Sequence, residues 1–143
     1  PIRIDETMRK ARMCYDHIAG ELGVALADAL QAHHHIELAD DGGVVTESGE
    51  AFFHRLGVDL TAARGARRAF CRPCVDWSER RTHIAGAVGA ALARRLIELR
   101  WIARKRDGRA LTITPIGWSK ISETFGCSLH EHAPRPALRL VAG

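Results

Sequence analysis

Thiol, carboxylate and imidazole side chains occur together at two places in the sequence. The two groups are Cys14, Asp16 and His17, and Cys74, Asp76 and His83. Thiolate and imidazole are ligands that suit zinc, copper, nickel or arsenic(III). If the two groups converge in the fold, they form a binding site for a small effector, for example a zinc or arsenic(III) ion. Occupancy of such a site would shift the protein between two states.

A further thiol lies next to the second group. Cys71 precedes Cys74 with the spacing Cys-x-x-Cys, which on a predicted helix is one turn. The predicted metal ligands are therefore Cys14, His17, Cys71, Cys74 and His83. A structural interpretation of these residues stays open. A cysteine on a helix is usually a small buried apolar residue, an aspartate near a helix start is usually a cap, and the two histidines could bond to each other.

The second group also contains six residues, 77–82, that the first group lacks. Trp77 offers an aromatic face, Arg80 and Arg81 offer a bidentate grip on an acid, and Glu79 offers a carboxylate. These side chains predict either a pocket for an organic ligand or an internal ion pair of Glu79 with an arginine. The sequence leaves the two alternatives open.

Both groups belong to an internal duplication, which determines the architecture. Arg-x-Cys-x-Asp occurs at residues 12–16 and 72–76, and His-Ile-Ala-Gly-x-x-Gly-x-Ala-Leu-Ala follows at 17–27 and 83–93. We assign one repeat to residues 5–60 and a second to residues 61–129, and the remaining tail is residues 130–143.

Each repeat is predicted to run helix, strand, strand, helix. Apolar residues at spacings of three and four predict helices over residues 5–32 and 83–99. Asp-Gly turns predict strand pairs at residues 36–46 and 101–114. In each repeat a threonine then caps a helix, which ends at a glycine. These glycines are Gly57 and Gly126.

Small residues within the first predicted helix indicate close packing against another backbone. They are Ala19, Gly20, Gly23 and Ala27. Residues 60–70 predict a basic helical connector, and Pro73 suits a first helical turn. The predicted fold class is α+β, mainly α, with two tandem repeats related by pseudo-twofold symmetry in a single domain of residues 1–143.

Composition limits the class of protein. No apolar run approaches the roughly 20 residues that cross a bilayer, so we expect no membrane contact. The N-terminus lacks the apolar block of a signal peptide, and the four cysteines are expected to be reduced thiols in the cytoplasm. The chain does not begin with Met, and we expect a fragment of a longer protein. Charge is uneven, with a net of −6 over residues 1–60 and +9 over residues 61–109.

The strings CYDHIAG, CVDWSERRTHIAGAVGAAL and RALTITPIGW are similar to the C-terminal region of ArsR-type (ArsR/SmtB) winged helix-turn-helix transcriptional regulators. This resemblance covers roughly residues 8–126. It implies that each helix–hairpin–helix unit is winged-helix-like and that the chain is an effector-sensing or dimerisation domain. It also implies a cytoplasmic, dimeric regulator that acts as a repressor of the ArsR type. The DNA-reading winged helix that precedes this region in the family has no match here.

Two other functions are weighed against the regulatory domain. The second predicted hairpin carries basic residues that suit a supporting contact with DNA phosphates. They are Arg104, Lys105, Arg106 and Arg109. An enzyme that uses Cys74 as nucleophile and His83 as base lacks an evident oxyanion site or orienting group, so we predict no enzyme activity.

Overall fold

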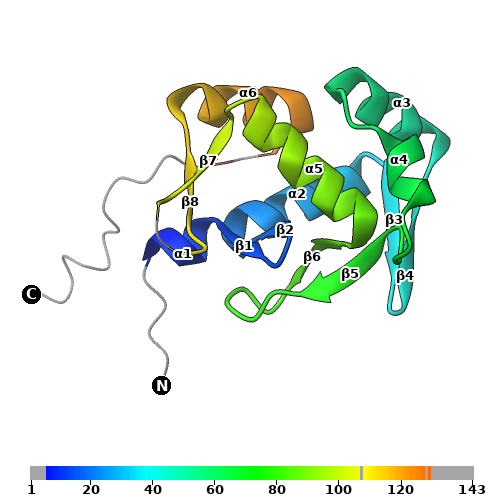
Figure 1. Cartoon of the computed structure of the whole chain (residues 1–143), viewed down its shortest axis with the longest axis horizontal. Coiled ribbons are helices and arrows are strands. Elements are labelled where there is room, and N and C mark those ends of the chain that lie inside the picture. The colour runs from blue at the N-terminus through cyan, green and yellow to red at the C-terminus, as the bar shows by residue number, and fades with distance from the viewer. Residues whose placement is uncertain (1–5, 107, 128, 130–143) are drawn as a thin grey trace, which may run out of the picture.

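The computed structural model describes residues 6–106, 108–127 and 129 (Figure 1). The first half contains α1 (Glu6–Lys10), β1 (Arg12–Cys14), β2 (His17–Ala19), α2 (Gly20–Ala32), β3 (Ile36–Ala39), β4 (Gly42–Val45), α3 (Glu47–Leu56) and α4 (Leu60–Gly65). The second half contains β5 (Arg72–Val75), β6 (Thr82–Ala85), α5 (Gly86–Glu98), β7 (Ile102–Arg104), β8 (Leu111–Ile113) and α6 (Pro115–Phe125). Both halves therefore run hairpin, helix, hairpin, helix, and the α+β class is confirmed. The predicted tail lies outside the described residues.

The short helices after the second hairpin of each half begin and end as the sequence indicates. The Thr46 hydroxyl accepts a hydrogen bond from the Gly49 amide at 3.1 Å, and Thr114 does the same for Gly117 at 3.0 Å. The C-terminal glycines, Gly57 and Gly126, have φ angles of 87° and 68°. A left-handed backbone at this position ends a helix with little strain only at glycine.

The prediction of one continuous helix over residues 5–32 is wrong. The chain leaves α1 after Lys10 and forms the antiparallel β1–β2 hairpin, whose two-residue turn has Tyr15 at a φ of 60°. Gly20 then starts α2 with a φ of 80°, a conformation that a helix interior does not accept. Strands of three residues carry too few apolar positions to reveal a period of two, so in the sequence the helical spacing of α2 continues backwards through them.

The same correction applies to the second half. The predicted helix over residues 83–99 starts only at Gly86, again at a φ of 80°, and His83 lies in β6. Pro73 lies in β5 rather than in a helical turn, and the predicted connector helix is shortened to α4. The cysteine, aspartate and histidine groups are therefore carried by β-hairpins and not by helices.

The two halves pack reciprocally: α2 contacts β6 of the second half, and α5 contacts β2 of the first. In Figure 1, α5 crosses the centre of the molecule, with α6, β7 and β8 on its left and α3, α4, β3 and β4 on its right. The completely buried side chains Leu96 and Val88 belong to α5, and Leu22 and Leu30 of α2 are 1% exposed. The core thus lies between the central helices and the hairpins.

Two helical glycines permit this close approach. A Cβ atom on Gly23 would lie 3.3 Å from the Cβ of His83, and one on Gly89 would lie 3.2 Å from the Cβ of His17. Each would also collide with a backbone carbonyl of the preceding hairpin, at Ile18 or Ile84. The prediction of a small-residue contact at Gly23 is confirmed, with a β-hairpin rather than a helix as the partner.

Gly89→Ala is expected to lower the free energy of unfolding by about 1–3 kcal/mol, because the added methyl group has no space beside Ile84 and His17. Urea denaturation measures this change. Gly65→Ala is the matched control, since a Cβ there meets nothing within 4 Å. Equal stability of the two variants would contradict the packing described.

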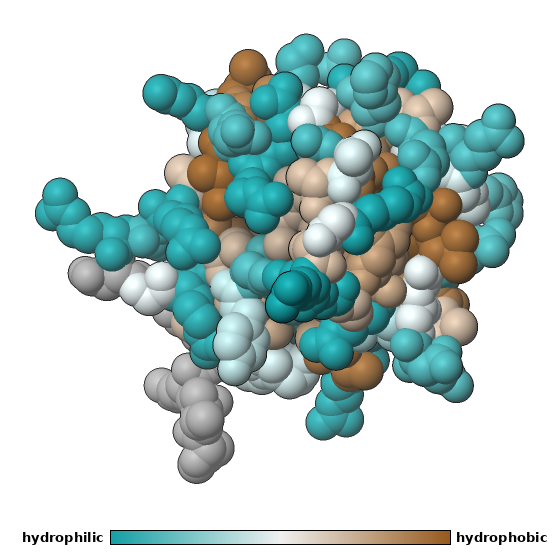
Figure 2. Space-filling model, turned by 45° about the vertical axis from the view of Figure 1, so that its right-hand side comes forward, coloured by the Kyte–Doolittle hydropathy of each residue, from teal (hydrophilic) through white to brown (hydrophobic). Residues whose placement is uncertain are grey.

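The surface is mixed. In Figure 2, hydrophilic side chains cover much of the visible face, and hydrophobic residues show between them in separate patches. No helix among the described residues combines the length and the apolar character needed to cross a membrane.

Candidate functional site

The β1–β2 and β5–β6 hairpins meet, and we call their contact the hairpin interface. Within each hairpin the cysteine and the histidine are direct cross-strand partners: Cys14 faces His17, and Cys74 faces His83. One ligand atom from each of these four side chains lies within 4.8 Å of the others. The structure thus brings together four residues from the two groups that the duplication identified. We call them the Cys/His cluster.

The two imidazoles contact each other and one carboxylate each. Their Nε2 atoms are 3.0 Å apart. The Nδ1 atom of His17 is 3.3 Å from Asp16, and the Nδ1 atom of His83 is 3.0 Å from Asp76. Three hydrogen bonds along this row need three protons, but two neutral imidazoles carry only two N–H groups. With both Nδ1–H groups donated to carboxylates, two Nε2 lone pairs face each other, an arrangement that a cation between them would relieve.

Burial keeps both imidazoles neutral near neutral pH. It lowers the pKa of His83 to about 4; the charge of His17 adds to this effect, and Asp76 opposes it. Burial likewise lowers the pKa of His17, against the opposing effect of Asp16. Burial and the adjacent Cys14 raise the pKa of the Cys74 thiol. Near neutral pH His17 and His83 are therefore neutral nitrogen donors, and Cys74 has a proton to lose when a cation binds.

Asp76 is the most heavily hydrogen-bonded side chain of the interface and is completely buried. It accepts hydrogen bonds from the Gly20 amide at 2.6 Å, the Arg12 guanidinium at 3.1 Å and the Ser78 hydroxyl at 2.7 Å. The amides of Ser78 and Glu79 each donate at 3.0 Å. Burial raises the pKa of Asp76, but these donors outweigh it and hold the pKa well below its usual range. Asp76 therefore remains a carboxylate.

Arg12 is the residue that sequence reasoning did not identify as functional. Its side chain is completely buried, and its guanidinium pairs with Asp76 from the other half. It also donates to the Ser78 hydroxyl at 3.0 Å and stacks 4.4 Å from the centre of the Trp77 ring. The repeated Arg-x-Cys-x-Asp string could have identified Arg12. In both copies an arginine stands two residues before a cysteine of the cluster.

The two halves differ at this point. Asp16 lies in a tight turn, has a side chain that is 42% exposed and pairs with Arg68. Burial raises the pKa of Asp16, and hydrogen bonds from Arg68 and His17 lower it below the usual value. Asp76, by contrast, is covered by the inserted residues 77–82. The insertion thus converts an exposed carboxylate position into a buried one.

The inserted side chains have partners within the chain. The Arg12 guanidinium stacks on the Trp77 ring, the Ser78 hydroxyl lies 3.3 Å from Glu79, and Arg81 pairs with Asp28. Arg80 is exposed and has a φ of 58°. These contacts favour the structural alternative for the insertion over the ligand pocket, although the predicted ion pair of Glu79 with an arginine is replaced by that of Asp76 with Arg12.

Cys71 lies apart from the cluster. It is three residues from Cys74 along an extended chain and so points to the opposite face, where its sulfur lies beside Gly43 of β4. Burial raises its pKa to about 11, which keeps it a thiol. The structure does not bring this predicted ligand to the other four. An arsenic(III) ion bound through three thiolates therefore fits the cluster less well than a zinc ion.

The basic hairpin β7–β8 lies beside β1. The Met13 amide donates to the Arg109 carbonyl at 2.8 Å, and the Leu111 amide donates to the Ala11 carbonyl at 3.0 Å. The predicted phosphate ligands are exposed on this hairpin and on its turn. They are Arg104, Lys105, Arg106 and Arg109. Backbone hydrogen bonds thus connect the strand that carries Cys14 to the basic surface.

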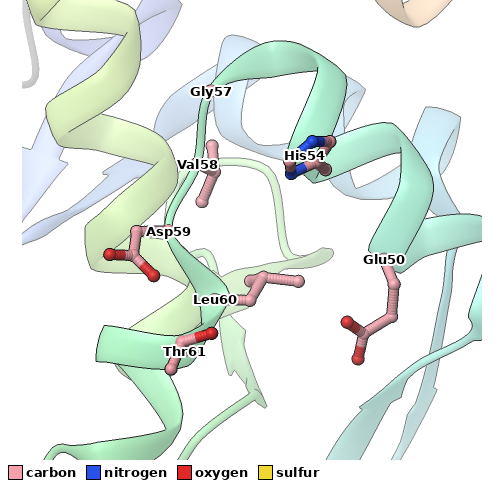
Figure 3. Close-up of a pocket in the computed structure, with 7 residues that line it drawn as sticks. All are labelled: Glu50, His54, Gly57, Val58, Asp59, Leu60 and Thr61. Atoms are coloured by element: carbon pink, nitrogen blue, oxygen red, sulfur yellow. The ribbon is translucent and has the colours of Figure 1, made fainter.

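A separate cavity of about 350 Å³ lies between α3 and α4, lined among others by Glu50, His54 and Asp59 (Figure 3). It contains none of the candidate ligand-binding, metal-binding or phosphate-binding residues that the sequence analysis selected. Its carboxylates and its imidazole are set around an open hollow, with Val58 and Leu60 between them. This cavity offers no convergent set of ligands comparable to the Cys/His cluster.

Comparison with curated proteins gives one informative relative. A Bacillus subtilis (strain 168) protein named "Uncharacterized HTH-type transcriptional regulator YdfF" is 47% identical over 107 residues. The chain is similar to a helix-turn-helix transcriptional regulator. The match covers 75% of this chain and 47% of that protein, so the chain spans about half the length of its relative. No family model and no solved structure matches the chain.

Proposed function

We propose that this chain is the regulatory domain of a DNA-binding transcriptional regulator of the ArsR type, acting in the cytoplasm as a homodimeric repressor. The observation that carries the proposal is the 47% identity over 107 residues to a protein named as an HTH-type transcriptional regulator. The relative is about twice as long as the matched region, which leaves room for a separate DNA-reading segment. The proposed role is regulation through binding, with no catalytic step.

In this proposal each half is a winged-helix-like unit, and a pseudo-twofold axis relates the two. The support is the repeated order of hairpin, helix, hairpin and helix, together with the reciprocal contacts of α2 with β6 and of α5 with β2. Such an arrangement places the Cys/His cluster on the axis. A ligand held there touches both halves equally.

The hairpin interface is the proposed effector-responsive element. A ligand bound by both hairpins adds free energy to the contact between the halves, and an equilibrium between two arrangements shifts by the difference in its affinity for them. The backbone hydrogen bonds of Met13 with Arg109 and of Ala11 with Leu111 carry a change in β1 to the basic hairpin. The two arrangements then differ in how that hairpin meets DNA.

The proposal assigns base reading to another segment of the regulator and only phosphate contacts to the basic hairpin. We therefore expect the isolated chain to bind duplex DNA with a dissociation constant of roughly 1–100 μM at physiological salt and without sequence preference. Fluorescence anisotropy with two labelled duplexes of unrelated sequence, at low and moderate salt, measures this. A tight, sequence-specific and salt-resistant complex would contradict the proposal and favour direct base reading by this chain.

Neutralising the basic hairpin tests the phosphate contact separately. A variant with glutamine at the four positions Arg104, Lys105, Arg106 and Arg109 is expected to lose most of the weak binding and to reduce the slope of log K against log salt by about 0.9 per lost phosphate contact. The control variant neutralises four exposed arginines elsewhere on the chain, Arg55, Arg67, Arg94 and Arg100. An equal loss in both variants would contradict a specific role for the hairpin.

A further inference from the structure

We propose that Cys14, His17, Cys74 and His83 form a four-coordinate site for a thiophilic divalent cation of the zinc class. Only the role of this cation as the effector bound at the hairpin interface rests on the proposed function. The site itself is argued from geometry and holds whether or not the chain regulates transcription.

The spacing of the four ligand atoms suits a tetrahedral ion. Zinc bound by two sulfurs and two nitrogens keeps its ligand atoms about 3.3–3.8 Å apart, given Zn–S and Zn–N distances of about 2.3 and 2.0–2.1 Å. In the structure all four lie within 4.8 Å of one another, and the two Nε2 atoms are 3.0 Å apart. The largest separation exceeds the tetrahedral range by about 1 Å, a difference that side-chain rotation can close.

The supporting residues hold the ligands in the binding orientation. Asp16 and Asp76 accept from the Nδ1 atoms of the two histidines, which directs both Nε2 lone pairs at the centre of the cluster. Metal-binding histidines characteristically donate their other ring N–H to a carboxylate in this way. Because each hairpin supplies one cysteine and one histidine, a bound ion cross-links the two halves of the chain.

Charge and donor type define the class of ion. Two thiolates neutralise a divalent cation, while the nearby Asp76 is already compensated by Arg12. Two sulfurs and two imidazole nitrogens exclude the hard cations Mg²⁺ and Ca²⁺, which take oxygen ligands. They suit Zn²⁺ and its spectroscopic substitute Co²⁺. The two thiols are only half-buried, which gives an ion access from solvent.

The test is a titration of the reduced, metal-free chain with Co²⁺ under anaerobic conditions. We expect one Co²⁺ per chain, with the visible bands of a tetrahedral centre and a thiolate charge-transfer band, both displaced by Zn²⁺. Cys14→Ser and Cys74→Ser are each expected to lose the charge-transfer intensity or the binding, whereas Cys127→Ser retains both. Absence of a tetrahedral spectrum in the wild-type chain, or an unchanged spectrum in both cluster variants, would overturn the proposal.

Asp16→Asn keeps the test valid if a cysteine variant fails to fold, because the Asp16 side chain is partly exposed. It is a positioning residue for His17, and its replacement is expected to raise the Co²⁺ dissociation constant about 10–100-fold while the unfolding midpoint of the metal-free chain changes little. Unchanged affinity would count against the site. A chain that takes up no Co²⁺ but binds DNA weakly and without sequence preference would overturn the metal site alone, so failure of this inference is distinguishable from failure of the regulatory assignment.

Discussion

Asp76→Ala is expected to lower the free energy of unfolding by about 3–5 kcal/mol, a large part of the 5–15 kcal/mol typical of a domain. The substitution leaves the completely buried Arg12 guanidinium without its counter-ion. It also removes the acceptor of the Gly20 amide at the start of α2. Chemical denaturation followed by circular dichroism measures the loss.

The duplication supplies the matched control for this variant. Asp16 occupies the equivalent position in the first half, but its side chain is 42% exposed and its partner Arg68 is 41% exposed. Exposed ion pairs contribute little, so Asp16→Ala is expected to cost about 1 kcal/mol or less. If the two variants lose similar amounts of stability, the buried pair of Arg12 with Asp76 does not hold the halves together as described.

Acid is expected to destabilise the metal-free chain by about 3 kcal/mol between pH 6.5 and 4. Burial lowers the pKa of His83 from 6.5 in the unfolded chain to about 4 in the folded one. Between these values the unfolded state binds a proton that the folded state does not, so stability rises with pH and is complete above 6.5. The lowered pKa of His17 acts with the same sign. Asp76, with its lowered pKa, adds a further loss only below about pH 4.

Urea denaturation at a series of pH values, with a chelator present, measures this dependence. His83→Gln is expected to flatten the profile between pH 6.5 and 4, because it removes the group that takes up the proton. His54→Gln is the control, since His54 is exposed on α3. A wild-type profile that is flat over this interval would contradict the neutral, buried state of His83.

Much of the fold follows from local signals in the sequence. The β3–β4 and β7–β8 strand pairs, the Thr46 and Thr114 caps and the left-handed glycines Gly57 and Gly126 are decided by residues close in sequence, and these predictions are confirmed. The duplication also indicated which cysteines and histidines belong together. Their convergence follows from the reciprocal packing of the two halves, which an internal repeat favours.

The rest depends on contacts that local patterns do not encode. The strands β1, β2 and β6 have three or four residues and adjoin a helix, so their apolar residues continue the helical spacing. Only the positive φ of Gly20 and Gly86 separates strand from helix. The pair of Arg12 with Asp76 spans 64 positions, and the insertion that buries it has no counterpart in the first half. Neither the pair of Arg12 with Asp76 nor the insertion is indicated by a periodic pattern of apolar residues in the sequence.

X-ray absorption spectroscopy at the zinc edge, on the chain loaded with one Zn²⁺, tests most directly that the two halves meet at one chemical centre. We expect a first shell of two sulfurs at about 2.3 Å and two nitrogens at about 2.0–2.1 Å, one of each from either hairpin. A shell of oxygen and nitrogen alone, without sulfur, would contradict the account.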